Sequence, residues 1–197
     1  MVEFAWLNSL VVSGDRQGSM AIWDINTGTA VKTMKNAHQG AVSKIMFYSD
    51  GMNSNIILSA GLKDGRLVAH DMRSHSVISQ GQIHGGAINM LASSLSGFIV
   101  TGAADKTIKT FDIFNSLNKV GAMQTTDAVF CGEVIQNLCI VGCGDGNILS
   151  FDLDKNECLY GYGADTTGAV HCLAINDDQD CIVTGGDSGL GLVLNMM

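Results

Sequence analysis

The pattern that decides the fold is clearest in residues 99–112, which read IVTGAADKTIKTFD. An apolar run leads to a glycine, a polar turn follows, and an alternating stretch then closes on an aromatic residue and an aspartate. The pattern recurs as VVSGDRQGSMAIWD, LSAGLKDGRLVAHD, CIVGCGDGNILSFD and IVTGGDSGLGLVLN, which begin at residues 11, 58, 139 and 182. The last residues of the five segments are 47, 41, 40 and 43 positions apart. This period and content predict repeated β units rather than helices.

A second repeated element opens another apolar stretch ahead of four of these segments. It reads GAV at 40–42, GAI at 86–88, DAV at 127–129 and GAV at 168–170. Asp-Gly pairs at 64–65 and 145–146 are strong signals for tight hairpins, because both residues tolerate a positive φ. Each unit is therefore predicted to form about four short strands joined by hairpins, and the fold class is all-β with antiparallel four-stranded sheets.

The repeated units resemble the WD repeats of β-propeller proteins over essentially the whole chain. Only Trp23-Asp24 is a literal Trp-Asp pair. The other units end in His70-Asp71, Phe111-Asp112, Phe151-Asp152 and Leu194-Asn195. The resemblance implies a single WD-repeat propeller region over residues 1–197, with units at approximately 1–35, 36–81, 82–122, 123–163 and 164–197.

The number of units is low for the resembled family, in which seven blades are usual. The chain holds about four complete blades plus a partial fifth, since the fifth has no counterpart of the outer strand at 30–33. Three explanations are open: a piece of a longer polypeptide, closure with fewer blades, or completion by another chain. An incomplete or partner-completed propeller is favoured, because unpaired strand edges at both ends promote aggregation.

In WD repeats, each blade can contain a buried hydrogen-bonded set of His, Ser or Thr, Asp and Trp. The resemblance assigns members of this structural set to Ser13 and Trp23 in the first unit, His38 and Asp64 in the second, His84, Thr101 and Asp105 in the third, and Asp145 in the fourth. The second unit has Ala60 and His70 at the remaining two places, Phe111 replaces the third tryptophan, and Val141 and Phe151 flank the fourth aspartate. No unit is predicted to carry the full set.

The histidines and glycines give no convincing catalytic centre. The spacing of His70 and His75, with His84 following, is compatible with metal ligands, but a packing role for His70 in a tryptophan position is favoured. His171 and Cys172 are adjacent in one strand and therefore face opposite ways, which excludes a Cys–His nucleophile pair between them. The stretch GCGDGN at 142–147 lacks the lysine and the following helix of a phosphate-binding loop. No catalytic, cofactor-binding or metal-binding residue is predicted.

Two exposed features are candidates for an interaction surface. Lys63 directly precedes the turn aspartate of the second unit, a position that often points to the peptide-binding face of WD-repeat proteins. Asp177, Asp178 and Asp180 form an acidic loop. This loop could hold a cation, but it lacks the glycine and distal glutamate of a calcium loop, so a solvated loop is favoured.

Charge and cysteine content narrow the cellular setting. The chain has 11 basic and 19 acidic residues, a net charge of −8. Residues 1–120 carry ten basic and eight acidic residues, whereas 121–197 carry one and eleven. This balance argues against nucleic acid as a partner. The six cysteines show no zinc-ligand spacing and indicate buried, reduced thiols. No signal peptide or membrane-spanning stretch is recognised, which favours a cytoplasmic location, with cytoskeletal or nuclear sites open.

These observations predict a non-enzymatic scaffold or adaptor for protein–protein interaction in a larger intracellular complex. Cytoskeletal or ciliary, ubiquitin-ligase adaptor, trafficking and signalling assemblies all fit. The expected partners are other subunits, including remaining blades from the rest of the chain or from another subunit, without membrane insertion and without a cofactor. One alternative is a metal-binding or enzymatic propeller that uses the 177–180 loop. A second is a nucleic-acid-associated WD-repeat subunit that uses the more basic first half.

Overall fold

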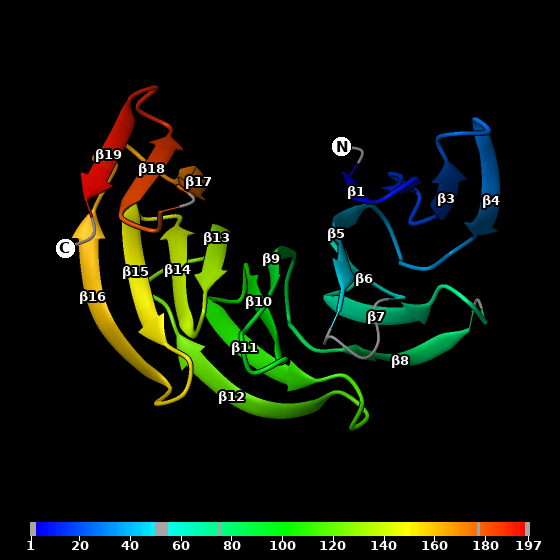
Figure 1. Cartoon of the computed structure of the whole chain (residues 1–197). Helices are drawn as coiled ribbons and strands as arrows, with labels where there is room; N and C mark the ends of the chain where they lie inside the picture. Colours follow the sequence, from blue (N-terminus) through cyan, green and yellow to red (C-terminus); the bar gives the residue numbers. More distant parts are fainter. Residues whose placement is uncertain (1–2, 50–54, 75, 177, 196–197) are drawn as a thin grey trace. The chain divides into compact units, whose positions relative to one another are not determined.

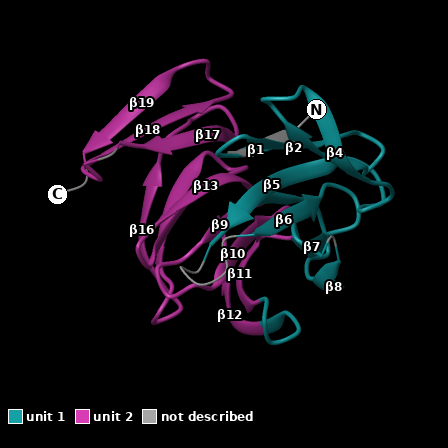
Figure 2. Ribbon diagram, turned by 45° about the vertical axis from the view of Figure 1, so that its right-hand side comes forward, with its two compact units in different colours: residues 1–91, 113–118 teal, residues 92–112, 119–197 magenta. Residues whose placement is uncertain are grey.

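The computed structural model describes residues 3–49, 55–74, 76–176 and 178–195 of the chain. Over these residues the backbone forms nineteen β-strands and no helix. Figure 1 colours these strands along the sequence. The chain divides into two compact units (Figure 2). Unit 1 comprises residues 1–91 and 113–118, and unit 2 comprises residues 92–112 and 119–197.

The described strands form five antiparallel sheets, in each of which neighbouring strands are consecutive in the chain. The first sheet contains β1 (Glu3–Leu7), β2 (Leu10–Gly14), β3 (Met20–Asp24) and β4 (Thr29–Met34), and the second contains β5 (Val42–Tyr48), β6 (Ile56–Gly61), β7 (Arg66–Asp71) and β8 (Val77–Gln82). The third contains β9 (Ile88–Ser93), β10 (Ile99–Ala103), β11 (Thr107–Asp112) and β12 (Asn118–Gln124), and the fourth contains β13 (Val129–Ile135), β14 (Leu138–Cys143), β15 (Asn147–Asp152) and β16 (Glu157–Gly163). The fifth contains β17 (Val170–Ile175), β18 (Cys181–Gly186) and β19 (Gly191–Asn195). The predicted all-β class and four-stranded antiparallel units are confirmed, with three strands in the last unit.

The turn between the second and third strands is one residue longer in the second sheet than in the others. The last registered pairs before the turn are Gly14–Met20, Gly102–Ile108, Gly142–Ile148 and Gly185–Gly191 in the first, third, fourth and fifth sheets. Each of these pairs encloses five residues. In the second sheet the last pair is Ala60–Leu67, which encloses the six residues 61–66. If the second unit is aligned with the others at Asp64 without a gap, the residues of β6 are therefore matched one position away from their structural counterparts.

This longer turn corrects the assignment of Ala60 to the serine or threonine place of the second unit. Ser13 lies two residues beyond the cross-strand partner of Trp23. Ser59 lies two residues beyond the cross-strand partner of His70, so Ser59 is the counterpart of Ser13. The sequence interpretation was wrong here because the inserted turn residue is invisible when the segments are aligned without a gap.

Apolar side chains between successive sheets form the core of each unit. In unit 1 the first and second sheets pack through a cluster formed by Val12, Met20, Ile22, Val42, Ile45 and Ile57. In unit 2 the fourth and fifth sheets pack through Ile140, Ile148, Val170 and Ile182. Alternate residues of each strand face the neighbouring sheet, which is why apolar residues recur with a period of two in the repeats.

The second strands of the sheets differ in how many faces they bury. All residues of β6 are buried, and β14 is buried from Cys139 to Cys143. In β18, by contrast, Ile182 and Thr184 are buried while Val183 between them is 47% exposed. Val193, the cross-strand partner of Val183, is 62% exposed. One face of the fifth sheet is therefore apolar and open.

Candidate interaction surface

A hydrogen-bonded set in unit 1 joins the connection before β5 to β6 and to the β6–β7 turn. His38 is 3% exposed, and its Nε2 lies 2.9 Å from the hydroxyl oxygen of Ser59. Its Nδ1 lies 3.5 Å from Oδ2 of Asp64. The same carboxylate oxygen accepts a hydrogen bond of 2.8 Å from the backbone N–H of Gln39. His38 and Asp64 were proposed from the sequence, whereas Ser59 was missed because of the longer turn.

His70 occupies the tryptophan place of this unit, in β7. The side chain is 6% exposed, and its Nε2 has no hydrogen-bond partner among the residues that the structure describes. Burial in apolar surroundings lowers the pKa of His70 to about 4, and the nearby His38 acts in the same direction. Burial also lowers the pKa of His38, against the opposing effect of Asp64. Both imidazoles are therefore held neutral in the folded protein at neutral pH.

Acidification is expected to destabilise the protein because of His70. Between pH 6.5, near the pKa of an unfolded histidine, and pH 4, the unfolded chain binds a proton that the folded chain does not. The free energy of unfolding therefore falls as the pH is lowered through this window, by about 2 kcal/mol between pH 7 and pH 5. Urea denaturation at both pH values measures this loss. His70→Phe should remove most of it, and an unchanged pH dependence in His70→Phe contradicts the assignment.

The first unit contains the Trp–Ser pair that the resemblance implied. The indole Nε1 of Trp23 in β3 donates a hydrogen bond of 2.9 Å to the hydroxyl of Ser13 in β2. Trp23 is nevertheless 41% exposed, so this bond lies at the surface of the described structure. The pair ties two neighbouring strands together by their side chains in addition to the backbone ladder.

The remaining residues proposed for the structural set lie in the third and fourth units. Asp105 accepts a hydrogen bond of 2.6 Å from the hydroxyl of Thr107 in its own turn, and Asp145 accepts one of 2.8 Å from the side-chain amide of Asn147. His84 is buried in unit 1, and Thr101 is buried in unit 2. Asp105 and Asp145 therefore both brace the turns in which they lie.

A backbone hydrogen bond recurs between each of these turns and the connection that follows the same sheet. It is donated by His38 to Gly18 (3.1 Å), by His84 to Gly65 (3.1 Å), by Thr125 to Lys106 (2.9 Å) and by Asp165 to Gly146 (3.0 Å). The four acceptor residues all have positive φ, with values between 58° and 85°. Thr125 and Asp165 thus take the place of the histidines in the later units, a correspondence that the sequence comparison missed.

Asp165 compensates for the absent histidine with its own hydrogen bonds. Its carboxylate accepts backbone N–H bonds from Thr167 at 2.8 Å and from Ser188 at 2.9 Å. The hydroxyl and the amide of Ser188, together with the amide of Thr167, hold the pKa of Asp165 well below its usual range. A buried carboxylate thus links the connection before β17 to the β18–β19 turn.

A polar cleft lies beside the His38 set in unit 1. Its volume is about 440 Å³. It is lined by Gln39, Lys63, Asp64, Arg66 and Gln82. Lys63 was proposed as an interaction residue from the sequence alone. The fold adds Arg66 from the start of β7 and Gln82 from the end of β8, which no motif in the sequence indicated.

Positive charge in this cleft is not neutralised by its only acid. The two carboxylate oxygens of Asp64 are taken up by the backbone N–H groups of Gln39 (2.8 Å) and Arg66 (3.1 Å). The guanidinium Nη2 of Arg66 donates to the amide oxygen of Gln80 at 2.8 Å. Lys63 is exposed and has no ion-pair partner among the described residues. The cleft therefore presents two cations to solvent and suits an anionic group.

The structure describes two of the three acidic residues in the loop after β17, Asp178 and Asp180. Asp180 is held inside the loop, where its Oδ1 accepts a hydrogen bond of 2.7 Å from the side-chain amide of Asn176. The amide oxygen of Asn176 in turn accepts from the backbone N–H of Asp180 at 3.1 Å. Asp178 is exposed, and Asp177 lies outside the described residues. Within the described part of the chain, no group of three or more His, Cys, Asp or Glu side chains could hold a metal ion.

The side chain of His171 contacts an acid and an aromatic ring. Its Nε2 lies 2.8 Å from Oδ1 of Asp187, and both side chains are about half exposed. The ring of Phe130 meets the imidazole edge-on, with centroids 5.3 Å apart. These partners come from β13, β17 and the β18–β19 turn, so only the fold brings them together.

The six cysteines are all free, but they are not all buried as the sequence suggested. Cys139 and Cys143 are buried, and burial raises the pKa of Cys143 to about 11. Cys158 and Cys172 are exposed. The expectation was wrong for these two because β16 and one face of the fifth sheet have no covering layer in the described structure.

Comparison with known proteins finds similarity to proteins that contain WD repeats. The family described as WD domain, G-beta repeat matches residues 156–190. A coronin-like protein of Saccharomyces cerevisiae is 26% identical over 162 residues, which cover 76% of this chain and 24% of that protein. The mRNA export factor GLE2 of Chaetomium thermophilum is 32% identical over 126 residues, 62% of this chain and 34% of that protein. The chain thus spans only about a quarter to a third of the length of these relatives.

A solved structure with the same fold extends the comparison to nearly the whole chain. A chain in the crystal structure of the mitotic checkpoint complex superposes with a TM-score of 0.85 at 18% sequence identity. The match covers 98% of this chain and 60% of that one. It confirms the predicted fold of WD-repeat propeller blades. In the described residues no helix is long and apolar enough to cross a membrane.

Proposed function

Because the chain belongs to the WD-repeat family, we propose that it is a non-enzymatic module that binds other proteins within a multiprotein assembly. The observation that carries this proposal is the cleft formed by Gln39, Lys63, Asp64, Arg66 and Gln82, hereafter the cationic cleft. The blades supply a rigid scaffold of strands, and the cleft residues are held on it by short turns and strand ends.

The cleft is preorganised to receive a carboxylate. Asp64 is fixed by backbone hydrogen bonds, so it cannot turn to neutralise Lys63. Arg66 is oriented by Gln80, and a guanidinium can bind a carboxylate through two parallel hydrogen bonds. We infer that the bound group is an aspartate or glutamate side chain in an exposed segment of a partner protein. A neutral segment would leave both cations without a partner.

Charge reversal in the cationic cleft is expected to weaken the binding of an acidic peptide. The probe is a fluorescein-labelled peptide with three glutamates, and its counterpart with three glutamines is the matched ligand. Lys63→Glu and Arg66→Glu should each weaken binding of the glutamate peptide by about tenfold or more, because each removes a charge-assisted contact worth roughly 1.5–3 kcal/mol. Fluorescence anisotropy titrations at constant ionic strength measure the change.

Lys35→Glu is the control, since it makes the same charge change at an exposed position outside the cleft. It should leave the affinity within about twofold, because surface charges at a distance are screened by salt. Equal affinity for the glutamate and glutamine peptides, or equal losses in all three variants, would overturn the proposed site. Thermal melting of each variant shows whether a loss reflects unfolding instead.

We also propose a cellular location and a type of assembly for the module. We place it in the cytoplasm, in an assembly whose other subunits or chain segments supply further blades. The open apolar face of the fifth sheet supports this, since Val183 and Val193 are suited to packing against another sheet. Cytoskeletal, ubiquitin-ligase, trafficking and signalling assemblies all remain compatible with an acidic partner.

A further inference from the structure

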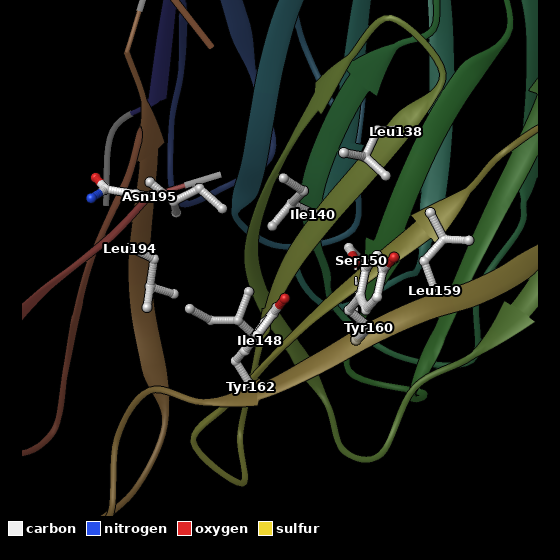
Figure 3. Close-up of a pocket in the computed structure, with 10 residues that line it drawn as sticks. Leu138, Ile140, Ile148, Ser150, Leu159, Tyr160, Tyr162, Leu194 and Asn195 are labelled. Carbon is white, nitrogen blue, oxygen red and sulfur yellow. Dashed lines mark hydrogen bonds between the residues drawn. The ribbon is translucent and has the colours of Figure 1, made fainter. Parts of the chain in front are cut away.

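Two cavities of similar volume differ in the side chains that line them. A cavity of about 420 Å³ in unit 2 is lined mainly by aliphatic and tyrosine side chains, as Figure 3 shows. None of the described residues that line it has an acidic or basic side chain. The cationic cleft of unit 1, at about 440 Å³, is lined by two bases and one acid. A charged ligand in the cleft therefore changes the electrostatic surroundings of the residues behind its wall.

The residue directly behind the acid of the cleft is a buried histidine. Asp64 lines the cleft, and its Oδ2 lies 3.5 Å from Nδ1 of His38, whose side chain has no exposed area. This separation is longer than the about 2.7–3.2 Å of an N–H···O hydrogen bond. Nδ1 of His38 has no hydrogen-bond partner among the described residues, whereas Nε2 lies 2.9 Å from the hydroxyl oxygen of Ser59. A proton added at Nδ1 would therefore lie between the imidazole and a carboxylate of the cleft.

The surroundings of His38 offer an acceptor to each nitrogen of a protonated ring. A charged imidazole carries an N–H on both nitrogens, whereas the neutral ring carries only one. In the charged form Nε2 would donate to the hydroxyl of Ser59, and Nδ1 would donate to the carboxylate of Asp64. Such a hydrogen bond between two charged groups is stronger than one between neutral groups. The fold can therefore hold the cation at this place once its electrostatic cost is lowered.

The charges around His38 come from the β6–β7 turn and from β7. Burial lowers the pKa of His38, the carboxylate of Asp64 opposes this effect, and the guanidinium of Arg66 adds to it. His70, also in β7, has its pKa lowered to about 4 by burial and is therefore neutral at higher pH. Arg66 differs from burial in one respect, because it lines the cleft and its charge can be offset by a bound anion.

We propose that the binding of an acidic side chain in the cationic cleft is coupled to the uptake of a proton by His38. The ligand carboxylate offsets the charge of Arg66, and the proton is then held between His38 and Asp64. By linkage, the affinity for an acidic partner increases as the pH falls from 7.5 to 5.5, a range in which a glutamate side chain stays ionised. This coupling rests on the function proposed for the cleft, since the acidic partner is the ligand that starts it.

The glutamate peptide, with both ends blocked, tests this coupling on the complete chain. Calorimetric titrations at pH 6 in two buffers of different ionisation enthalpy should show net proton uptake on binding. The affinity should increase by about two- to threefold between pH 7.5 and pH 5.5, because the charges that interact lie near solvent. Nuclear magnetic resonance of the chain with isotope-labelled histidines assigns the proton, since the pKa of His38 should rise when the glutamate peptide is added and not when the glutamine peptide is added.

A variant reproduces the effect of the ligand without any peptide. Arg66→Gln should by itself raise the pKa of His38, whereas Lys32→Gln, which removes an exposed charge on β4, should not. An unchanged pKa of His38 in Arg66→Gln overturns the coupling. So does peptide binding without proton uptake, a result that leaves the function proposed for the cleft intact. Absence of binding at millimolar peptide at both pH values overturns that function and the coupling together.

Discussion

Replacing Phe151 by alanine is expected to lower the free energy of unfolding by about 3–5 kcal/mol. Phe151 lies in β15, is 1% exposed, and pairs with Cys139 on one side and Cys158 on the other. It takes the tryptophan place of the fourth unit and is among the largest fully buried side chains. Removing its ring leaves a cavity that flanking β-strands cannot close without breaking their ladders. Urea denaturation followed by circular dichroism measures the loss.

Leu190→Ala provides the control for this cavity effect. Leu190 is also in unit 2 but is 75% exposed, so its truncation should change stability by less than about 0.5 kcal/mol. Phe151→Leu should retain a large part of the stability, because it keeps an apolar side chain in the site. A Phe151→Ala variant as stable as Leu190→Ala would show that the fourth and neighbouring sheets are not packed as described.

Replacing Gly146 by alanine is expected to lower the free energy of unfolding by about 2–5 kcal/mol. Gly146 has φ of 83° in the β14–β15 turn. A β-carbon there would overlap the carbonyl oxygen of Asp165 and lie 2.8 Å from that of Gly168. The third unit has Lys106 at the corresponding place with φ of 62°. The expected loss therefore comes mainly from the overlap with the connection before β17, and only partly from the backbone angle.

Gly189→Ala isolates the contribution of the backbone angle. Gly189 has φ of 72°, but a β-carbon there would have no atom of the described residues within 4 Å. Its replacement should cost only about 1 kcal/mol, from the left-handed conformation alone. Chemical denaturation of the two variants side by side gives the difference. Equal losses would mean that the carbonyl group of Asp165 does not lie as close to Gly146 as the structure indicates.

Much of the fold could be predicted from the sequence because its strands and turns depend on local residue patterns. Strands that bury one or both faces between sheets need apolar residues with a period of two, and tight hairpins need Gly, Asp or Asn. Both signals recur in each unit of about forty residues, so a unit in which one signal is weak can still be recognised by comparison with the others. The segment 99–112 alone indicates two strands and their turn, which are β10 and β11 in the structure.

The errors arose where the repeats differ in length or depend on contacts between distant residues. One extra residue in the β6–β7 turn moved the hydroxyl partner of His38 from position 60 to Ser59. The place of His38 passes to Asp165 in a later unit, which a search for histidine cannot find. The exposure of Cys158 depends on which strands lie beside β16, a property of packing that no local pattern encodes.

Only part of the candidate site could be predicted from the sequence, because its other residues meet only when the strands pair. Lys63 stands out by its place before the turn aspartate, but Arg66 and Gln82 join it only when β7 and β8 pair. In the acidic loop, by contrast, the carboxylates are close in sequence, but that of Asp180 accepts a hydrogen bond from Asn176 within the loop. Neighbours along a chain need not be neighbours in a site.

Site-specific photo-cross-linking in cells tests the central claim most directly. A benzophenone amino acid placed at position 39, where Gln39 lines the cleft and both cations are kept, should cross-link a discrete protein partner. The yield should fall at least about tenfold when Arg66→Glu is added or when the glutamate peptide competes. The same amino acid at position 35, outside the cleft, should give no such product. Equal cross-linking from positions 39 and 35, or a product at position 39 that neither treatment removes, would contradict recognition of an acidic partner through the cationic cleft.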